Sequence, residues 1–186
     1  MELDPRDARN RTPRFAGRLR HAVIAAALFL CGCVSYAPTV PEGYAGPTVL
    51  LEDTWISDHG TRATFFVVTH IDGRSVQNSL VETRKASAGE GFTLHGRVVA
   101  TRQVPVRPMR LRLVGTHMTA APIHEVAARL MGTFQSVDGE VDFEPVETGV
   151  YRVTGSLSPE QSCVWVEEGW SRAAVTEKVW TPRGNS

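Results

Sequence analysis

The sequence contains no apolar run long enough to cross a membrane as a helix. Its longest run covers residues 22–30, nine residues, whereas a bilayer core needs about 20. No second apolar run of membrane length follows it. A permanent transmembrane helix is therefore not predicted, and the run instead has the length of the apolar region of a secretion signal.

The sequence also lacks the motifs of common enzyme classes. His124-Glu125 begins a zinc-protease pattern, but Ala128 occupies the position of the second histidine. Segment 155–159, Gly-Ser-Leu-Ser-Pro, lacks the second glycine of a nucleophile elbow. There is no glycine-rich phosphate loop, no His-x-His spacing and no cysteine pair at zinc-ligand spacing outside the N-terminal region. We therefore predict no catalytic residue, no metal site and no cofactor.

The N-terminal region has the order of a secretion signal: basic residues, the apolar run, then small residues. The residues concerned are Arg14, Arg18, Arg20 and His21 before the run, and Leu30-Cys31-Gly32-Cys33 at its end. Basic residues before an apolar segment stay on the cytoplasmic side, so the rest of the chain is expected to be exported.

The ending of this signal resembles the lipobox of bacterial lipoproteins, which has Leu three positions before the modified cysteine and a small residue just before it. The resemblance implies that residues 1–32 are a cleaved signal peptide and that Cys33 carries a diacylglycerol thioether and an N-acyl chain such as palmitate. Two or more acyl chains hold a protein firmly on a membrane. Val34, where Asp commonly signals inner-membrane retention, implies the outer membrane, with the domain facing the periplasm or the cell surface.

Cleavage before Cys33 would leave 154 residues, enough for one domain. They carry 14 basic and 17 acidic residues, a net charge of −3, which argues against a nucleic-acid partner. Besides Cys33 only Cys163 remains, so no intramolecular disulfide is predicted. Cys163 lies in the apolar segment 163–166 and is interpreted as a small buried thiol.

Three parts follow in order: the signal peptide 1–32, a lipidated N-terminus and flexible tether 33–47, and a domain 48–186. The tether is predicted because Pro and Gly recur in it and no basic residue occurs. From Thr48 onward apolar residues mostly alternate with polar ones. This period predicts an all-β domain, an immunoglobulin-like or transthyretin-like β-sandwich of about eight strands. One short amphipathic helix is predicted around 122–131.

Two Asp-Gly pairs predict tight turns. Asp72-Gly73 follows the β-branched and aromatic segment 63–71, and we expect the chain to return as a strand over 75–81. Asp138-Gly139 separates 134–137 from 141–143, and a second hairpin is expected there.

Charge is segregated along the chain, and two interpretations remain open. Arg97, Arg102, Arg107, Arg110 and Arg112 lie in a stretch without acids, whereas five acids fall within 138–147 without a base. Alternation with apolar residues predicts that Arg110 and Arg112 lie on the solvent face of a strand over 109–114, and that the acids of 138–144 point outward. In the structural interpretation, the arginine strand lies beside the acidic segment and the two neutralise each other. In the functional one, Arg97, Arg110 and Arg112 form a binding surface for an acidic protein or for anionic envelope glycans and lipids.

Trp170 and Trp180 are the second candidate contact residues, since one lies beside a glycine and the other near the C-terminus. The prediction from sequence is a membrane-anchored binding or assembly module. The alternatives are an envelope enzyme that uses His117 or His124 with a carboxylate, and a periplasmic metal-binding protein.

Overall fold

The computed structural model describes residues 35–58, 62–89, 100–119 and 134–181, which are mostly β-strand. The strands are β1 (Thr48–Glu52), β2 (Thr54–Asp58), β3 (Arg62–Ile71), β4 (Arg74–Ser75), β5 (Thr101–Pro105), β6 (Met109–Thr119), β7 (Ser136–Phe143), β8 (Val150–Ser156), β9 (Cys163–Glu168) and β10 (Val179–Trp180). Within these ranges the one α-helix, α2, spans Ser79–Ala86.

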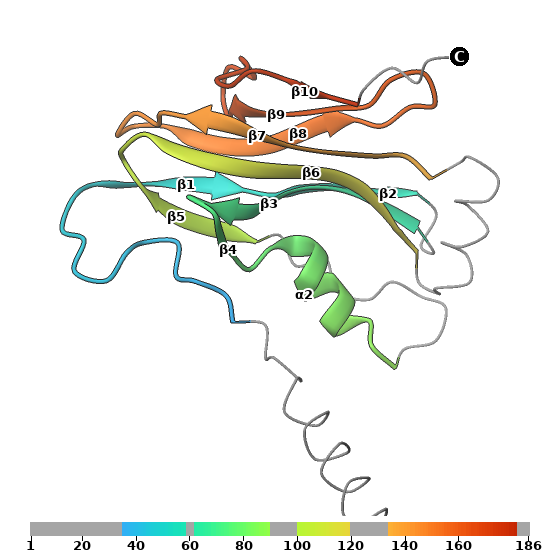
Figure 1. The fold of residues 1–186 in the computed structure, drawn as a ribbon, viewed down its shortest axis with the longest axis horizontal. Coiled ribbons are helices and arrows are strands. Elements are labelled where there is room, and N and C mark those ends of the chain that lie inside the picture. The colour runs from blue at the N-terminus through green and yellow to red at the C-terminus, as the bar shows by residue number, and fades with distance from the viewer. Residues whose placement is uncertain (1–34, 59–61, 90–99, 120–133, 182–186) are drawn as a thin grey trace, which may run out of the picture. The chain divides into compact units, whose positions relative to one another are not determined.

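The strands form two sheets, whose strands overlap in the view of Figure 1. One sheet has the order β10-β9-β8-β1-β5, and the other has the order β2-β3-β6-β7 with β4 paired to β3. All pairs are antiparallel except β1 with β8. The predicted all-β class is therefore confirmed.

The main apolar core lies between the two sheets. Its fully buried side chains come from both layers, for example Leu51 and Val153 from one sheet and Phe66, Leu111 and Leu113 from the other. Each such side chain stabilises the fold by about 1.5–3 kcal/mol relative to its exposed state. The alternation predicted for β6 is confirmed, because Met109, Leu111 and Leu113 are buried while Arg110 and Arg112 are exposed.

A second apolar cluster lies on the outer face of the β3-containing sheet. It consists of Ala63, Phe65, Val67 and Met118, with Trp55 and Leu80 packed against it. Leu80 is on α2, so this helix covers part of the outer face. Because β3 is buried on both faces, its sequence reads as a nearly continuous apolar run rather than an alternating one.

The first Asp-Gly turn is present, but the strand after it is shorter than predicted. Asp72 and Gly73 both have positive φ, and β3 returns as the two-residue β4. The strand expected over 75–81 is wrong, since α2 begins there. Asn78 is the N-cap, and its side-chain oxygen accepts a hydrogen bond from the Val81 N–H at 3.2 Å, which favours the helix.

The second predicted hairpin is also wrong, because β7 runs unbroken through Asp138 and Gly139. Gly139 pairs with Leu113 in mid-strand. A Cβ at Gly139 would lie 2.5 Å from a Val179 methyl group, so the glycine makes room for β10 rather than for a turn.

The compact unit begins at Tyr36, not at Thr48. The Ala37 N–H donates to the Ser75 carbonyl at 2.8 Å, and the Thr39 hydroxyl donates to the Gln103 carbonyl at 2.6 Å. Part of the predicted tether therefore packs on the domain. The helix predicted around 122–131 lies outside the described residues, as do Cys33, Arg97 and His124.

Candidate functional site

Both described arginines of the predicted binding surface lie beside acidic residues of the neighbouring strand. Antiparallel pairing of β6 with β7 places Arg112 opposite Glu140 and Arg110 opposite Asp142. Arg112 donates from Nε and Nη2 to the two carboxylate oxygens of Asp138, at 2.8 and 2.6 Å. These two hydrogen bonds and the Asp138 charge raise the pKa of Arg112 above its ordinary value.

Arg110 is held more loosely by two carboxylates. Its Nε lies 3.3 Å from Asp142 Oδ1, and its Nη1 lies 3.7 Å from Glu140 Oε2. In β6 and β7 the charge pattern therefore agrees with the structural interpretation. The arginines of β6 and the acids of β7 face solvent side by side, and their charges neutralise each other. Exposed cross-strand pairs of this kind contribute about 0.2–1 kcal/mol each.

The two candidate tryptophans are both exposed. Trp180, on β10, is 48% exposed, and Trp170, in the connection from β9 to β10, is 84% exposed. Trp170 is the most exposed of the large apolar side chains in the described part of the chain.

The turn that carries Trp170 is held by a carboxylate. Glu168 Oε2 accepts hydrogen bonds from the Ser171 N–H at 2.6 Å and from the Trp170 N–H at 3.1 Å. These bonds, the Ser171 contact first, lower the pKa of Glu168 below its ordinary value. The turn continues through Arg172, whose backbone φ of 59° lies in the left-handed region.

The same turn is fixed to the adjacent strands. The Gly169 N–H donates to the Val150 carbonyl at 2.6 Å, and Arg172 Nη1 donates to Glu167 Oε1 at 2.8 Å. Trp170 is thus an exposed ring on a backbone that is already ordered. A side chain presented in this way loses little conformational entropy when a partner covers it.

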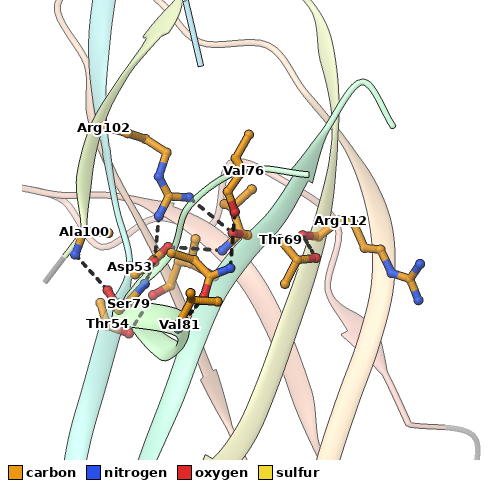
Figure 2. Close-up of polar contacts among 12 residues, drawn as sticks. Asp53, Thr54, Thr69, Val76, Ser79, Val81, Ala100, Arg102 and Arg112 are labelled. Carbon is orange, nitrogen blue, oxygen red and sulfur yellow. Dashed lines mark hydrogen bonds and ion pairs between the residues drawn. The ribbon is translucent and has the colours of Figure 1, made fainter. Parts of the chain in front are cut away.

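A buried ion pair lies where the chain passes from one sheet to the other (Figure 2). Asp53 separates β1 from β2 and is 1% exposed, and its Oδ2 lies 2.6 Å from Arg102 Nη2. The Val68 N–H donates to Asp53 Oδ1 at 3.1 Å, and the Ser79 N–H donates to Oδ2 at 2.8 Å. Burial raises the pKa of Asp53, and the Arg102 charge and the two N–H groups oppose that rise.

This cluster connects four parts of the fold. Ser79 begins α2, and its hydroxyl accepts a hydrogen bond from the Ala100 N–H at 2.8 Å, just before β5. The Asp53 N–H donates to the Ala100 carbonyl at 3.1 Å. The sequence analysis did not single out this pair. The available signal was that Arg102 occupies the inward phase of β5, two residues before the buried Val104.

A groove of about 450 Å³ runs beside β7 and is lined by Arg110, Glu140, Val141, Asp142, Glu177, Lys178 and Val179. A second hollow of about 500 Å³ is lined by Pro108, Met109, Asp142, Phe143, Glu144 and Val175. Asp142 borders both. The outward position of Glu140 and Asp142 was predicted from the sequence, but the groove was not. Its opposite side is formed by residues 177–179, which are distant from β7 in the sequence.

The described histidines take part in local hydrogen bonds. His117, 7% exposed, shares one with the Thr64 hydroxyl at 2.9 Å and one with Gln135 Oε1 at 3.1 Å. His70 contacts the hydroxyls of Thr69 and Ser75, each at 3.0 Å. Within the described ranges, no group of three or more His, Cys, Asp or Glu side chains is arranged to hold a metal ion. Cys163 is buried and free.

No protein-family model, curated protein or solved structure matches the chain. Among the described residues, no helix combines the length and apolar character needed to span a bilayer.

Proposed function

We propose that this protein is a lipid-anchored lipoprotein of the bacterial outer membrane that acts as a binding or assembly module. The tetrapeptide Leu30-Cys31-Gly32-Cys33 supports the anchor, with acylation at Cys33. The two-sheet domain is proposed to be an immunoglobulin-like or transthyretin-like sandwich, which displays loops and edges rather than an enclosed cleft.

The observation that carries the binding role is the exposure of Trp170 on an ordered turn. The Trp170 ring is 84% exposed, and a partner that covers it would remove its apolar surface from water, which is favourable. Tryptophans are enriched among the residues that dominate binding energy at protein interfaces. The hydrogen bonds that Glu168 Oε2 accepts from the Trp170 and Ser171 N–H groups, and the one that the Gly169 N–H donates to the Val150 carbonyl, order the backbone of this turn before any partner arrives.

The anchor is tested by mass spectrometry of the protein purified from native membranes. The expected N-terminus is Cys33 with three acyl chains, and Cys33→Ser is expected to move the protein from the membrane to the soluble fraction. An unmodified Cys33, or a wild-type protein that washes off the membrane, would overturn the lipoprotein assignment.

The binding role is tested by crosslinking in intact envelopes followed by recovery of the protein. Trp170→Ala is expected to reduce partner recovery at least tenfold with unchanged thermal stability, because the turn is held by backbone groups and by Glu168. Ile56→Ala is a matched control, since Ile56 is also exposed, at 57%, but lies on β2. Equal recovery with Trp170→Ala and Ile56→Ala would contradict a binding role for this turn.

The double variant Arg110→Glu with Arg112→Glu distinguishes the structural from the functional interpretation of the charge pattern. Because both arginines pair with carboxylates of β7, the double change is expected to lower stability. Partner recovery should then fall only as far as the folded fraction falls. A complete loss of recovery in a fully folded double variant would instead assign binding to the arginines.

A further inference from the structure

The strand β7 is an edge of its sheet. In the described part of the chain it pairs with β6 on one side only. On the inward face of β7, which also carries the buried Val137 and Val141, Gly139 packs against Val179 of β10. An edge strand has unpaired backbone N–H and C=O groups that can pair with another extended chain.

Beyond Gly139 two hollows lie beside β7, and we refer to them together as the track. The groove beside Glu140 and Val141 and the hollow beside Phe143 and Glu144 meet at Asp142. The segment 175–179 forms the opposite bank, with Val175 and Val179 among its lining residues. Residues 140–144 extend over about 17 Å at a strand's rise per residue, so about five residues of an extended segment fit along this length.

The apolar residues of the track are supplied by inward positions of the strands. Val141 and Phe143 are inward residues of β7, and Met109 is their counterpart at the start of β6. These three side chains are only 1–6% exposed and belong to the core, so the apolar surface that a partner can contact here is that of Val175, which is 40% exposed.

The rim of the track is acidic. Glu140, Asp142 and Glu144 point outward along β7, and Glu177 lies on the opposite bank. Of the two bases, Arg110 pairs with Glu140 and Asp142, and the Lys178 ammonium stacks on the Trp165 ring at 4.1 Å from its centroid. Four acids against two bases leave a rim charge of −2, which favours a basic occupant.

We infer that this track binds an extended, basic segment of a partner protein, which adds to β7 as a strand. The inference rests on the proposed binding function and adds to the Trp170 turn a second contact site, whose partner segment is basic. Main-chain hydrogen bonds to β7 supply affinity, and basic side chains at alternate positions lie beside Glu140, Asp142 and Glu144. A second copy of β7 would instead bring its own acidic row against these carboxylates.

The test is titration of the full-length protein, in detergent micelles, with fluorescent seven-residue peptides. The first peptide alternates Lys with Val, the second replaces each Lys by Glu, and the third is the Lys peptide with alternate backbone nitrogens methylated. Only the first is expected to bind, at least tenfold more tightly than either of the others. Equal binding of the Glu peptide would overturn the charge argument, and equal binding of the methylated peptide would overturn strand addition.

The site is located by variants. Asp142→Asn with Glu144→Gln is nearly isosteric and is expected to weaken the Lys peptide at least tenfold. Glu160→Gln is the matched control, because Glu160 is an exposed acid in the connection between β8 and β9. An unchanged dissociation constant in the double variant, with thermal unfolding showing it folded, would overturn the site.

This outcome can be distinguished from a failure of the proposed function. If the Lys peptide does not bind but Trp170→Ala still reduces partner recovery, the track is wrong and the binding module stands. If Cys33 is unmodified and Trp170→Ala has no effect, the proposed function fails whatever the peptides do.

Discussion

At the scale of single residues, the buried ion pair between Asp53 and Arg102 carries a large desolvation penalty. Both side chains are almost fully withdrawn from water, with exposures of 0% and 6%. Burial of an ion costs several kcal/mol, which its partner and its hydrogen bonds must offset. The intact pair is therefore expected to add little net stability, whereas the loss of either partner is expected to be costly.

Removing one partner of this pair is expected to leave the other charge buried and uncompensated. Asp53→Asn and Arg102→Met are each expected to lower the free energy of unfolding by about 3–5 kcal/mol. The double variant is expected to lose less than the sum of the two, by about 1–3 kcal/mol. Urea unfolding of all four proteins measures this coupling, and strictly additive losses would show that the two charges do not interact.

The lowered pKa of Glu168 predicts that the stability of the Trp170 turn depends on pH. Its folded pKa lies below the value of 4.5 of an unperturbed glutamate. The hydrogen bonds to its carboxylate therefore stabilise the turn above about pH 4.5 and are lost as the pH falls through the folded pKa. In NMR spectra, the Ser171 amide proton is expected to shift with a midpoint below pH 4.5. Glu168→Gln should abolish that transition, and a midpoint above 4.5 would refute the assignment.

At the scale of elements, residue patterns predicted which face of a strand is buried but not always where the element ends. The alternation in β6 and the outward acids of β7 were readable because a strand repeats every two residues, whatever its partners are. Gly139 was misread as a turn because the neighbour that requires a glycine, Val179, lies far away in sequence. The short helix α2 was missed since its apolar residues are few and Asn78 gives the main local signal.

Asn78 tests how far α2 depends on its cap. Asn78→Ala is expected to lower the free energy of unfolding by about 1 kcal/mol, because the Val81 N–H loses its acceptor. Asn78→Ser should retain most of the stability, and Arg84→Ala, an exposed change on the same helix, should stay within about 0.5 kcal/mol of the wild type. A chemical denaturation series measures all three, and an Asn78→Ala protein as stable as the wild type would show that the cap is dispensable.

At the scale of the whole domain, segments distant in sequence close the fold. The chain near Ala37 and Thr39 hydrogen-bonds to β4 and β5, and Lys85 of α2 lies 5.7 Å from the Tyr36 ring centroid. Without an intramolecular disulfide in the predicted mature chain, such contacts and the apolar core are what hold the two sheets together.

Truncation tests whether this N-terminal segment belongs to the domain. A chain that begins at Thr48 is expected to be less stable than one that begins at Tyr36 by about 1–3 kcal/mol, since it lacks the packing of Tyr36 and the three hydrogen bonds that Ala37, Thr39 and Pro47 make to the rest of the domain. Urea midpoints of the two purified chains provide the measurement. Identical midpoints would mean that residues 36–47 act as a free tether.

The sequence by itself determined the all-β class, the inward and outward faces of β6 and β7, the turn at Asp72-Gly73 and the burial of Cys163, because each depends on local periodicity or residue size. Only the tertiary structure decided that the chain changes sheets at Asp53, that Arg102 is the partner of its carboxylate, and that β7 forms one side of a groove. These features depend on which distant strands pair and pack. That choice is set by burial summed over the whole core, which no local pattern records.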